Sequence, residues 1–316
     1  MFNSNIGELI KTLRKQKNLT QDQLSDGICA KDTLWRIENG KTFPHWQVFE
    51  LIMQKLGEDP RKYFENYAIT SDRKLIAWKD ELKLLLRKSD DESIKKSELL
   101  TATLEQHEAF QEGPGLQLIL TAKASTAFHQ KEYNEVLKYA LEAIKISKPS
   151  FDENEIDTYI LFFDEIWLIN QIAVAHFFIT SIERSTEILL KLKNSLDKNY
   201  TDDEEKSKTY VRILYNLTDT LGLLKRYDEC REYCRSGIAI CKKYDNYFYH
   251  LPLFWFNMAC CSFYTGNHKE GICQWSKAYA LFFGLERFGE LSEAETFLQK
   301  EFGDVKPSFI SNQEEK

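Results

Sequence analysis

Three stretches of 25 residues align without gaps, and this repetition constrains the fold more than any other feature of the chain. Residues 216–240 align with residues 257–281, and residues 122–146 fit the same register. Small residues recur at two positions, where a pair of antiparallel helices has to approach closely. An aromatic residue or a histidine recurs near the start of the second helix. The recurring sets are Ala124, Thr218 and Ala259; Tyr133, Tyr227 and His268; and Ala143, Gly237 and Ala278.

The pattern resembles tetratricopeptide (TPR) helical hairpins, which stack into a curved solenoid with a concave binding surface. Tyr133 and Tyr227 are 94 residues apart, which leaves room for one further copy, and we place it at 165–195. We expect a more diverged pair at 74–112 and a C-terminal capping helix at 291–302. The copies are spaced by about 41 to 47 residues, more than the usual TPR period of about 34, and longer helices and loops account for the difference.

Composition favours an all-α protein, because six prolines and 13 glycines leave few helix breakers. The longest apolar runs, such as 172–179, are far too short to span a membrane. The N-terminus contains no apolar signal segment, and the seven cysteines are odd in number and form no C-x-x-C pair. These features predict reduced, mostly buried thiols in a cytoplasmic protein without a membrane partner.

Signatures of enzymes are absent from the sequence. It contains no nucleophile elbow, no phosphate-binding loop, no zinc-protease motif and no Gly-rich dinucleotide turn. Cys230 and Cys234 share a helix face, but no second ligand pair stands at zinc spacing. We therefore expect no catalytic residue, no metal site, no cofactor and no enzyme activity.

The first 67 residues have a different pattern, with five short helices expected. Ile6, Leu9, Ile10 and Leu13 form one apolar face, with Lys11, Arg14 and Lys15 outside it. Thr20 and Gln23 have the spacing of a capping box at the start of a second helix. A third helix begins near Ala30 and ends at Asn39–Gly40, a fourth follows Pro44, and a short fifth begins at Pro60.

The stretches "LTQDQL" and "TLWRIENGK" resemble the Cro/cI-type (XRE) helix-turn-helix family over about residues 6–66. The short turn "DGICAKDT" is similar to that of the Rgg/PlcR-like peptide-sensing regulators, also called RRNPP regulators. The resemblance implies a five-helix DNA-binding domain at 1–67, followed by a TPR-like ligand-sensing and dimerisation domain at 72–305.

The third helix is then the recognition helix, with Leu34 and Ile37 facing the core and an outward face that enters the major groove. Arg36 is the best base reader, because a guanidinium pairs with guanine O6 and N7. By resemblance, Gln21 contacts a phosphate through its side chain and the helix N-terminus. The candidate DNA-binding residues are Thr20, Gln21, Lys31, Asp32, Thr33, Trp35, Arg36, Asn39 and Lys41.

Asp32 and Trp35 each have two interpretations. Asp32 lies in the first helical turn, where a carboxylate favours the helix dipole, or it accepts a hydrogen bond from a cytosine amino group. Trp35 packs on a thymine methyl group or on another part of this protein.

The inward side of the first helix of each hairpin supplies the candidate ligand site. Asn216 and Asn257 occupy comparable places, and a ladder of side-chain amides can hold the backbone of an extended peptide. Alternatively, these amides tie helices together or face water. The candidate peptide-binding residues are Asn170, Gln171, Arg212, Tyr215, Asn216, Asp219, Phe256, Asn257 and Tyr264, with Trp167 or Phe178 as further members.

Charge is divided unevenly, since residues 1–67 carry ten Lys and Arg against nine Asp and Glu, a formal +1, and the rest of the chain carries −8. An acidic total disfavours broad coating of nucleic acid but allows a local basic face. The resemblance implies a quorum-sensing transcription regulator, a homodimer that binds double-stranded operator DNA and a short linear peptide. Three alternatives remain: a phage- or antitoxin-type repressor whose solenoid binds a protein, a regulator without a ligand, and a Rap-like interaction scaffold.

Overall fold

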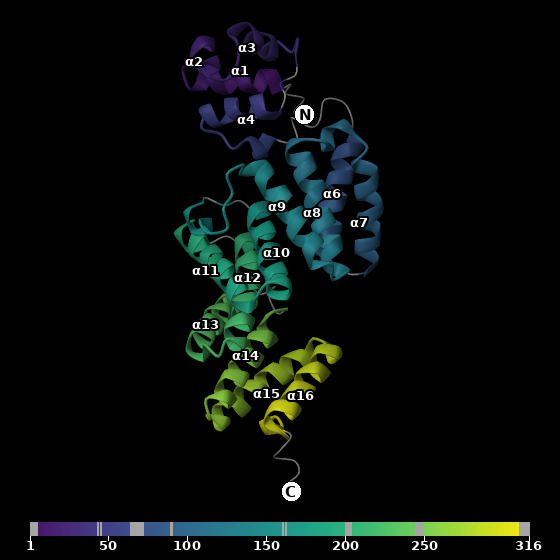
Figure 1. The fold of residues 1–316 in the computed structure, drawn as a ribbon, viewed down its shortest axis with the longest axis vertical. Helices are drawn as coiled ribbons and strands as arrows, with labels where there is room; N and C mark the ends of the chain where they lie inside the picture. The colour runs from purple at the N-terminus through teal and green to yellow at the C-terminus, as the bar shows by residue number, and fades with distance from the viewer. Residues whose placement is uncertain are drawn as a thin grey trace. The chain divides into compact units, whose positions relative to one another are not determined.

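The computed structural model describes residues 6–42, 44, 46–63, 73–88, 91–159, 161, 163–199, 204–243 and 249–309. These residues form helices and loops with no β-strand, which confirms the predicted all-α class (Figure 1). The chain divides into two compact units, Met1–Ser150 and Phe151–Lys316. Within the described ranges, no helix is both long and apolar enough to cross a membrane. The boundary predicted between residues 67 and 72 lies outside the described residues.

The first unit begins with the five helical segments expected at the N-terminus. The fifth is a short turn of 3-10 helix, so only four of them are α-helices. The capping box at the start of the second helix is confirmed, since Thr20 Oγ1 accepts from the Gln23 backbone and Gln23 Oε1 accepts from the Thr20 backbone. The segments are α1 (Ile6–Gln16), α2 (Gln21–Ser25), α3 (Lys31–Glu38), α4 (Trp46–Lys55) and η1 (Pro60–Tyr63).

These segments enclose a small apolar core. Leu34 and Ile37 of α3 are fully buried in it, as their spacing predicts. Gly7 allows α1 to approach α3 closely, because a Cβ atom at this position would lie 2.0 Å from the carbonyl oxygen of Ile37. The other residues of this core include Ile6, Ile10, Leu24, Phe49, Ile52 and Met53.

The remaining helices form contacting pairs that match the predicted hairpins. In the first unit these are α6 (Arg73–Lys88) with α7 (Asp91–Leu104), and α8 (Gly113–His129) with α9 (Tyr133–Ser147). In the second unit, three pairs are followed by a single C-terminal helix, as expected. They are α10 (Phe163–Ile179) with α11 (Ile182–Asn199), α12 (Glu204–Leu223) with α13 (Tyr227–Lys243), α14 (Leu251–Tyr264) with α15 (His268–Gly284), and then α16 (Phe288–Phe302).

The turns that precede α9, α13, α15 and α16 share one backbone geometry. Each contains one residue with a left-handed backbone, with φ of 61° at Lys131, 59° at Lys225, 78° at Gly266 and 57° at Glu286. Each closes with the same hydrogen bond, from a backbone N–H to the carbonyl five residues earlier, as in a Schellman cap. The aligned aromatic or histidine residue is therefore the first residue of the second helix, at Tyr133, Tyr227 and His268, and Phe288 occupies the same place at the start of α16.

Candidate functional site

The outward face of α3 is polar and exposed. Lys31 and Arg36 have side chains that are 59% and 58% exposed, and Asp32 is 80% exposed. Lys31 donates to Asp22 at 2.6 Å, and Arg36 Nε lies 4.0 Å from the Asp32 carboxylate one turn away. Exposed pairs of this kind contribute little to stability. Both cations therefore exchange their partner at small cost when a stronger anion approaches.

Trp35 lies on the same face and is 40% exposed. The ammonium group of Lys41 stands 4.4 Å from the centre of the indole ring, a cation–π contact. The Asn39 side-chain amide donates to the Trp35 carbonyl oxygen at 2.7 Å, and the Lys41 backbone N–H donates to the Arg36 carbonyl at 2.8 Å. The residues after the helix end are thus tied back to its last turn.

A largely buried ion pair between Arg14 and Glu38 joins the end of α3 to α1. Glu38, at the end of α3, accepts from Arg14 Nε at 2.5 Å and Arg14 Nη2 at 2.8 Å, and from Gln21 Nε2 at 2.7 Å. Burial raises the pKa of Glu38, but the hydrogen bonds from Arg14 and Gln21 outweigh it, and the net shift is downward. The prediction that Arg14 points outward is wrong, because its guanidinium is drawn inward to this carboxylate. The side-chain nitrogen of Gln21 already donates to Glu38 within the protein, and the phosphate contact of Gln21 stays a prediction. The DNA contacts of Thr20, which is exposed, and of Thr33, which is half-buried, also stay predictions.

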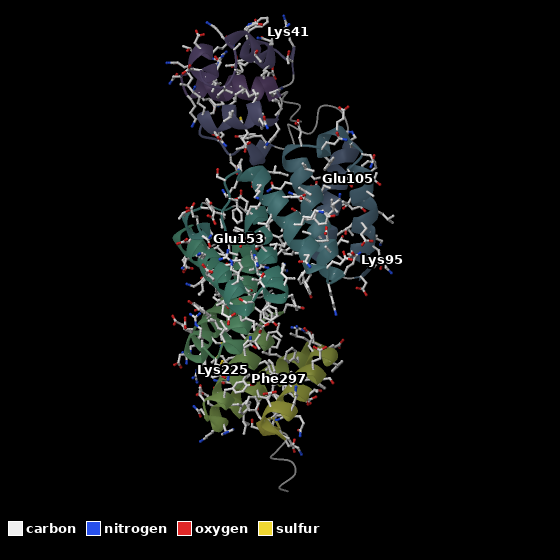
Figure 2. All side chains as sticks on the ribbon, viewed as in Figure 1. Lys41, Lys95, Glu105, Glu153, Lys225 and Phe297 are labelled. Atoms are coloured by element: carbon white, nitrogen blue, oxygen red, sulfur yellow. The ribbon has the colours of Figure 1, made fainter. Side chains whose placement is uncertain are left out.

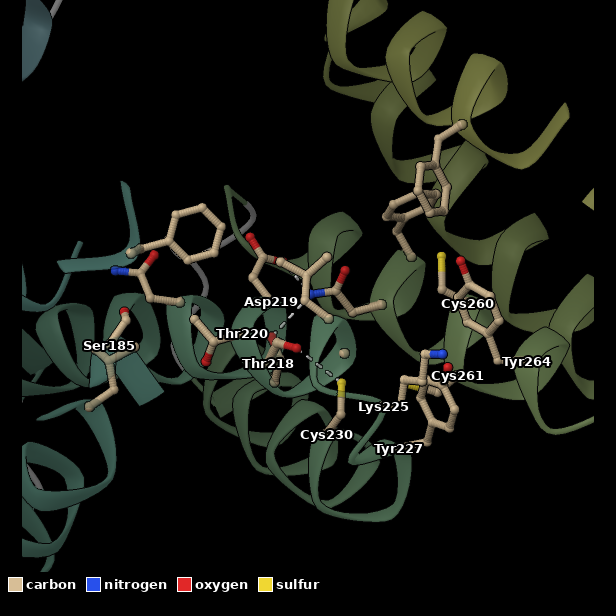
Figure 3. A pocket seen from close by; sticks show the side chains of 18 of the residues that line it. Ser185, Thr218, Asp219, Thr220, Lys225, Tyr227, Cys230, Cys260, Cys261 and Tyr264 are labelled. Carbon is tan, nitrogen blue, oxygen red and sulfur yellow. Dashed lines mark hydrogen bonds between the residues drawn. The ribbon is translucent and has the colours of Figure 1, made fainter. Parts of the chain in front are cut away.

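The second unit contains a groove of about 730 Å³ (Figure 3). Its lining comes from α10 to α14 and from α16. Lys225, in the turn before α13, and Phe297, on α16, both belong to it (Figure 2). Phenylalanine, leucine and valine supply seven of the 21 lining residues, and the polar lining residues include Asn216, Asn257, Asp219, Lys225 and Glu301. A largely apolar groove of this size with a few polar groups is typical of ligand sites.

Five of the nine predicted groove residues line this cavity, and four do not. Those that line it are Asn216, Asp219, Phe256, Asn257 and Tyr264. Arg212 lies one turn before Asn216 on α12, with its guanidinium carbon 4.6 Å from the centre of the Trp167 ring. The other three outside it are Asn170, Gln171 and Tyr215.

The asparagine side chains join neighbouring helices across the groove. Asn216 Nδ2 donates to Asn170 Oδ1 at 2.9 Å. Asn257 Nδ2 donates to Thr218 Oγ1 at 3.1 Å and to Asp219 Oδ1 at 2.8 Å. Within the described ranges, no group donates to the side-chain oxygens of Asn216 and Asn257. The amides therefore tie helices together and still present an acceptor each.

Titratable groups around α12 are shifted toward their neutral forms by burial. The pKa of Asp219 is raised by burial, against hydrogen bonds from Asn257 and Tyr215 that lower it. The pKa of His250 falls to about 3, because it is buried and faces Arg212 and Arg287. Burial likewise lowers the pKa of Arg212. His250 is accordingly a neutral ring at physiological pH.

The comparisons with known proteins bear on both parts of the chain. Residues 5–62 match the family model described as a helix-turn-helix domain. The N-terminal segment is a helix-turn-helix domain. A comparison with curated proteins returned no match to this sequence.

Several solved structures resemble this chain over more than nine tenths of its length. PlcR of Bacillus thuringiensis, solved in complex with the peptide PapR7 and DNA, has a TM-score of 0.53 and 19% identity, covering 92% of this chain and 98% of PlcR. Its apo form has a TM-score of 0.55 and 18% identity, with 92% and 98% covered. The apo form of the competence regulator ComR from Streptococcus vestibularis has a TM-score of 0.53 and 14% identity, with 95% and 99% covered. These likenesses show that the chain has the fold of PlcR and ComR, from the helix-turn-helix domain to the C-terminal helices.

Sequence reasoning missed several residues of the groove. Ser185 comes from α11, the second helix of its hairpin, whereas only first helices were expected to contribute. Phe297 comes from α16, which was expected only to cap the array. An apolar residue on an amphipathic helix has the same pattern whether it faces a core or a cavity, so no signal in the sequence distinguishes them.

Cysteines also contribute to the lining, at Cys230, Cys260 and Cys261. All seven cysteines are free thiols, and four of them are buried, as the composition suggests. Burial raises the pKa of Cys241 to about 12, so this thiol stays protonated and unreactive at neutral pH.

Proposed function

We propose that this chain is a cytoplasmic transcription regulator of the quorum-sensing type, without enzyme activity. In this proposal, residues 1–67 bind double-stranded operator DNA and residues 72–305 bind a short linear peptide and dimerise. One observation carries it: a helix-turn-helix domain and a ligand-sized groove occur together in a chain with the fold of PlcR, which was solved with a peptide and DNA.

The DNA contact is supported by the chemistry of α3. Arg36 is exposed on the outward face of the third helix and is held only by a weak pair with Asp32. A guanidinium at this place reads guanine in the major groove, whereas Lys31 and Lys41 supply charge for phosphates.

The peptide contact is supported by the acceptors of Asn216 and Asn257. An extended peptide presents backbone N–H groups at regular spacing, and side-chain carbonyl oxygens on neighbouring helices can accept from them. The apolar wall, with Phe256 and Phe297, provides surface for the peptide's side chains.

The test measures binding of the intact protein to the DNA upstream of its gene, with and without synthetic peptides encoded by small reading frames beside that gene. We expect one of these peptides to change DNA affinity, and Asn216→Ala and Asn257→Ala to weaken peptide binding by about fivefold or more each. Asn134→Ala, an exposed amide on α9, is the matched control. If both groove variants bind the peptide as tightly as wild type, the amide contacts are wrong.

For the DNA-binding face, Arg36→Ala is expected to relax preference at one base pair, worth about 1–3 kcal/mol. Arg235→Ala, an exposed arginine on α13, serves as its control. Full retention of site preference by Arg36→Ala would remove Arg36 as the base reader. A protein that co-purifies in the groove, with no peptide effect, would favour the repressor with a protein partner.

A further inference from the structure

Three charged side chains line the groove: Asp219, Glu301 and Lys225. Glu301 and Lys225 are exposed to water, whereas Asp219 is only partly exposed and forms no ion pair within the described residues. Asp219 lies in the middle of the lining on α12, with Asn257 Nδ2 donating to it at 2.8 Å and Tyr215 as a second donor (Figure 3). Among the described residues, no lysine, arginine or histidine lies within ion-pair distance of this carboxylate. Both of its donors are neutral groups.

The cations nearest to Asp219 in sequence form no ion pair with it. Arg212 is seven residues earlier on the same helix, about 10 Å away along its axis, and its guanidinium is stacked on Trp167. Lys225 follows the end of α12 in an exposed turn and lines the same groove, but it forms no ion pair with Asp219 within the described residues. A carboxylate removed from water without a cation is unfavourable, and burial raises the pKa of Asp219 accordingly.

A second polar group in the lining lacks a partner. Ser185 is 1% exposed, and its Oγ has no hydrogen-bond partner within the part of the chain that the structure describes. Buried hydroxyl groups are nearly always hydrogen-bonded. Ser185 lines the same groove between apolar residues such as Val174 and Leu189. The groove thus offers a carboxyl group without a cation and a free hydroxyl within a largely apolar wall. A positively charged ligand group would favour the ionised form of this carboxyl group.

We propose that the ligand of this groove carries a positively charged group, which pairs with the carboxylate of Asp219. The inference rests on the proposed function, in which the ligand is a short peptide, so the cation is either its free amino terminus or a Lys or Arg side chain. Both are ammonium or guanidinium donors, and a charge-assisted hydrogen bond to a carboxylate is about twice as strong as a neutral one. An anionic group at the same place is disfavoured by repulsion from Asp219.

The experiment incubates the intact protein with a defined mixture of synthetic hexapeptides in which one position is varied at a time. The mixture is used with free amino termini and, separately, fully acetylated at the amino terminus. Peptides retained by the protein after rapid gel filtration are quantified by mass spectrometry. Asp219→Asn is compared with wild type, and Asp228→Asn, the same change at a 99% exposed side chain on α13, is the control.

We expect wild type to retain cationic peptides about tenfold or more above their neutral counterparts, and Asp219→Asn to lose this preference while still retaining peptides. Loss of the preference on acetylation assigns the cation to the amino terminus, whereas selection of Lys or Arg in acetylated peptides assigns it to a side chain. Retention of peptides by wild type without any preference for positive charge overturns the inference alone. Retention of no peptide by wild type contradicts the proposed function as well.

Asp219→Asn preserves the shape of the side chain, but it changes the acceptor for Asn257. Asp219→Glu therefore provides a second variant, which keeps the charge and is expected to keep the preference for cationic peptides at reduced affinity. If Asp219→Glu and Asp219→Asn lose the preference equally, the charge of residue 219 is not what selects the ligand.

Discussion

At the scale of single residues, the least predictable feature was the partner of each charged side chain. Helical periodicity placed Leu34 and Ile37 in the core correctly, because burial follows from spacing on one helix. It placed Arg14 outside, since nothing in α1 alone indicates that Glu38, 24 residues later, folds onto it. The asparagine contacts could not be predicted for the same reason, since Asn216 and Asn170 are 46 residues apart and meet only through packing of helices.

The Arg14–Glu38 pair makes the stability of the helix-turn-helix domain depend on pH. The pKa of Glu38 is lowered in the folded state, so its contribution is fully present above the unfolded value of about 4.3 and is lost as pH falls through the lowered folded value. We expect Glu38→Gln to destabilise the domain at pH 7 by about 1–3 kcal/mol, because it leaves the partly buried Arg14 guanidinium without a counter-charge.

Hydrogen–deuterium exchange at pH 7, read in peptides that cover α1 and α3, measures the stability of the domain. Its loss at low pH is measured by how readily a protease cleaves the same segments as the pH is lowered. Glu8→Gln removes an exposed carboxylate from the same domain and should leave protection unchanged. Equal protection in wild type and Glu38→Gln would show that the pair is not needed for stability.

Trp35 has a structural partner in Lys41, and we expect its role to be to position that ammonium group for a DNA phosphate. Lys41→Ala should then weaken DNA binding about equally for all sequences and reduce the salt dependence by about one phosphate contact. Trp35→Ala should produce much of the same loss, and the double variant should add little, as expected for two residues that act through one contact. Fluorescence anisotropy at several salt concentrations measures this, and a change in base preference in Trp35→Ala would indicate a thymine contact instead.

At the scale of helices, the repeats were predictable because each hairpin needs small residues where its helices cross. The alignment did not show how each copy satisfies this need. Gly237 aligns with Ala143 and Ala278, but a Cβ atom at 237 would lie 2.3 Å from the ring of Phe254. The left-handed turn was also hidden, because Lys131 and Glu286 occupy positions where glycine is the usual signal.

Gly237→Ala is therefore expected to destabilise the protein by about 1–3 kcal/mol, although alanine is the better helix former by about 1 kcal/mol. Urea unfolding followed by circular dichroism measures the change. Gly289→Ala on α16, where a Cβ atom meets nothing within 4 Å, should be at least as stable as wild type. The double variant Gly237→Ala with Phe254→Leu should be less affected than the sum of its parts, and strict additivity would contradict the proposed clash.

At the scale of the whole molecule, the proposed homodimer makes a geometric prediction about its operator. Two helix-turn-helix domains in one dimer contact half-sites about 10 base pairs apart or a multiple of this. Inserting about five base pairs between the half-sites should weaken binding strongly. Inserting about ten should weaken it less, because the half-sites then face the same side of the DNA again. Gel-shift titrations measure the affinities, and insensitivity to spacing would show that the two domains bind independently.

The hydrogen bonds of the groove asparagines have a consequence for how the helices of the second unit can move. One hydrogen bond joins α12 to α10, from Asn216 to Asn170, and another joins α14 to α12, from Asn257 to Asp219. The helices α10 and α12, and α12 and α14, also contact each other. A ligand that donates hydrogen bonds only to the free side-chain oxygens of Asn216 and Asn257 leaves these two bonds in place. A ligand that binds the Asn216 or Asn257 nitrogen, or the Asp219 carboxylate, competes with the bond in which that group takes part. Because each repeat of a solenoid contacts only its neighbours, small displacements at these helices would add along the array, and we expect a ligand that breaks either bond to change the superhelical pitch.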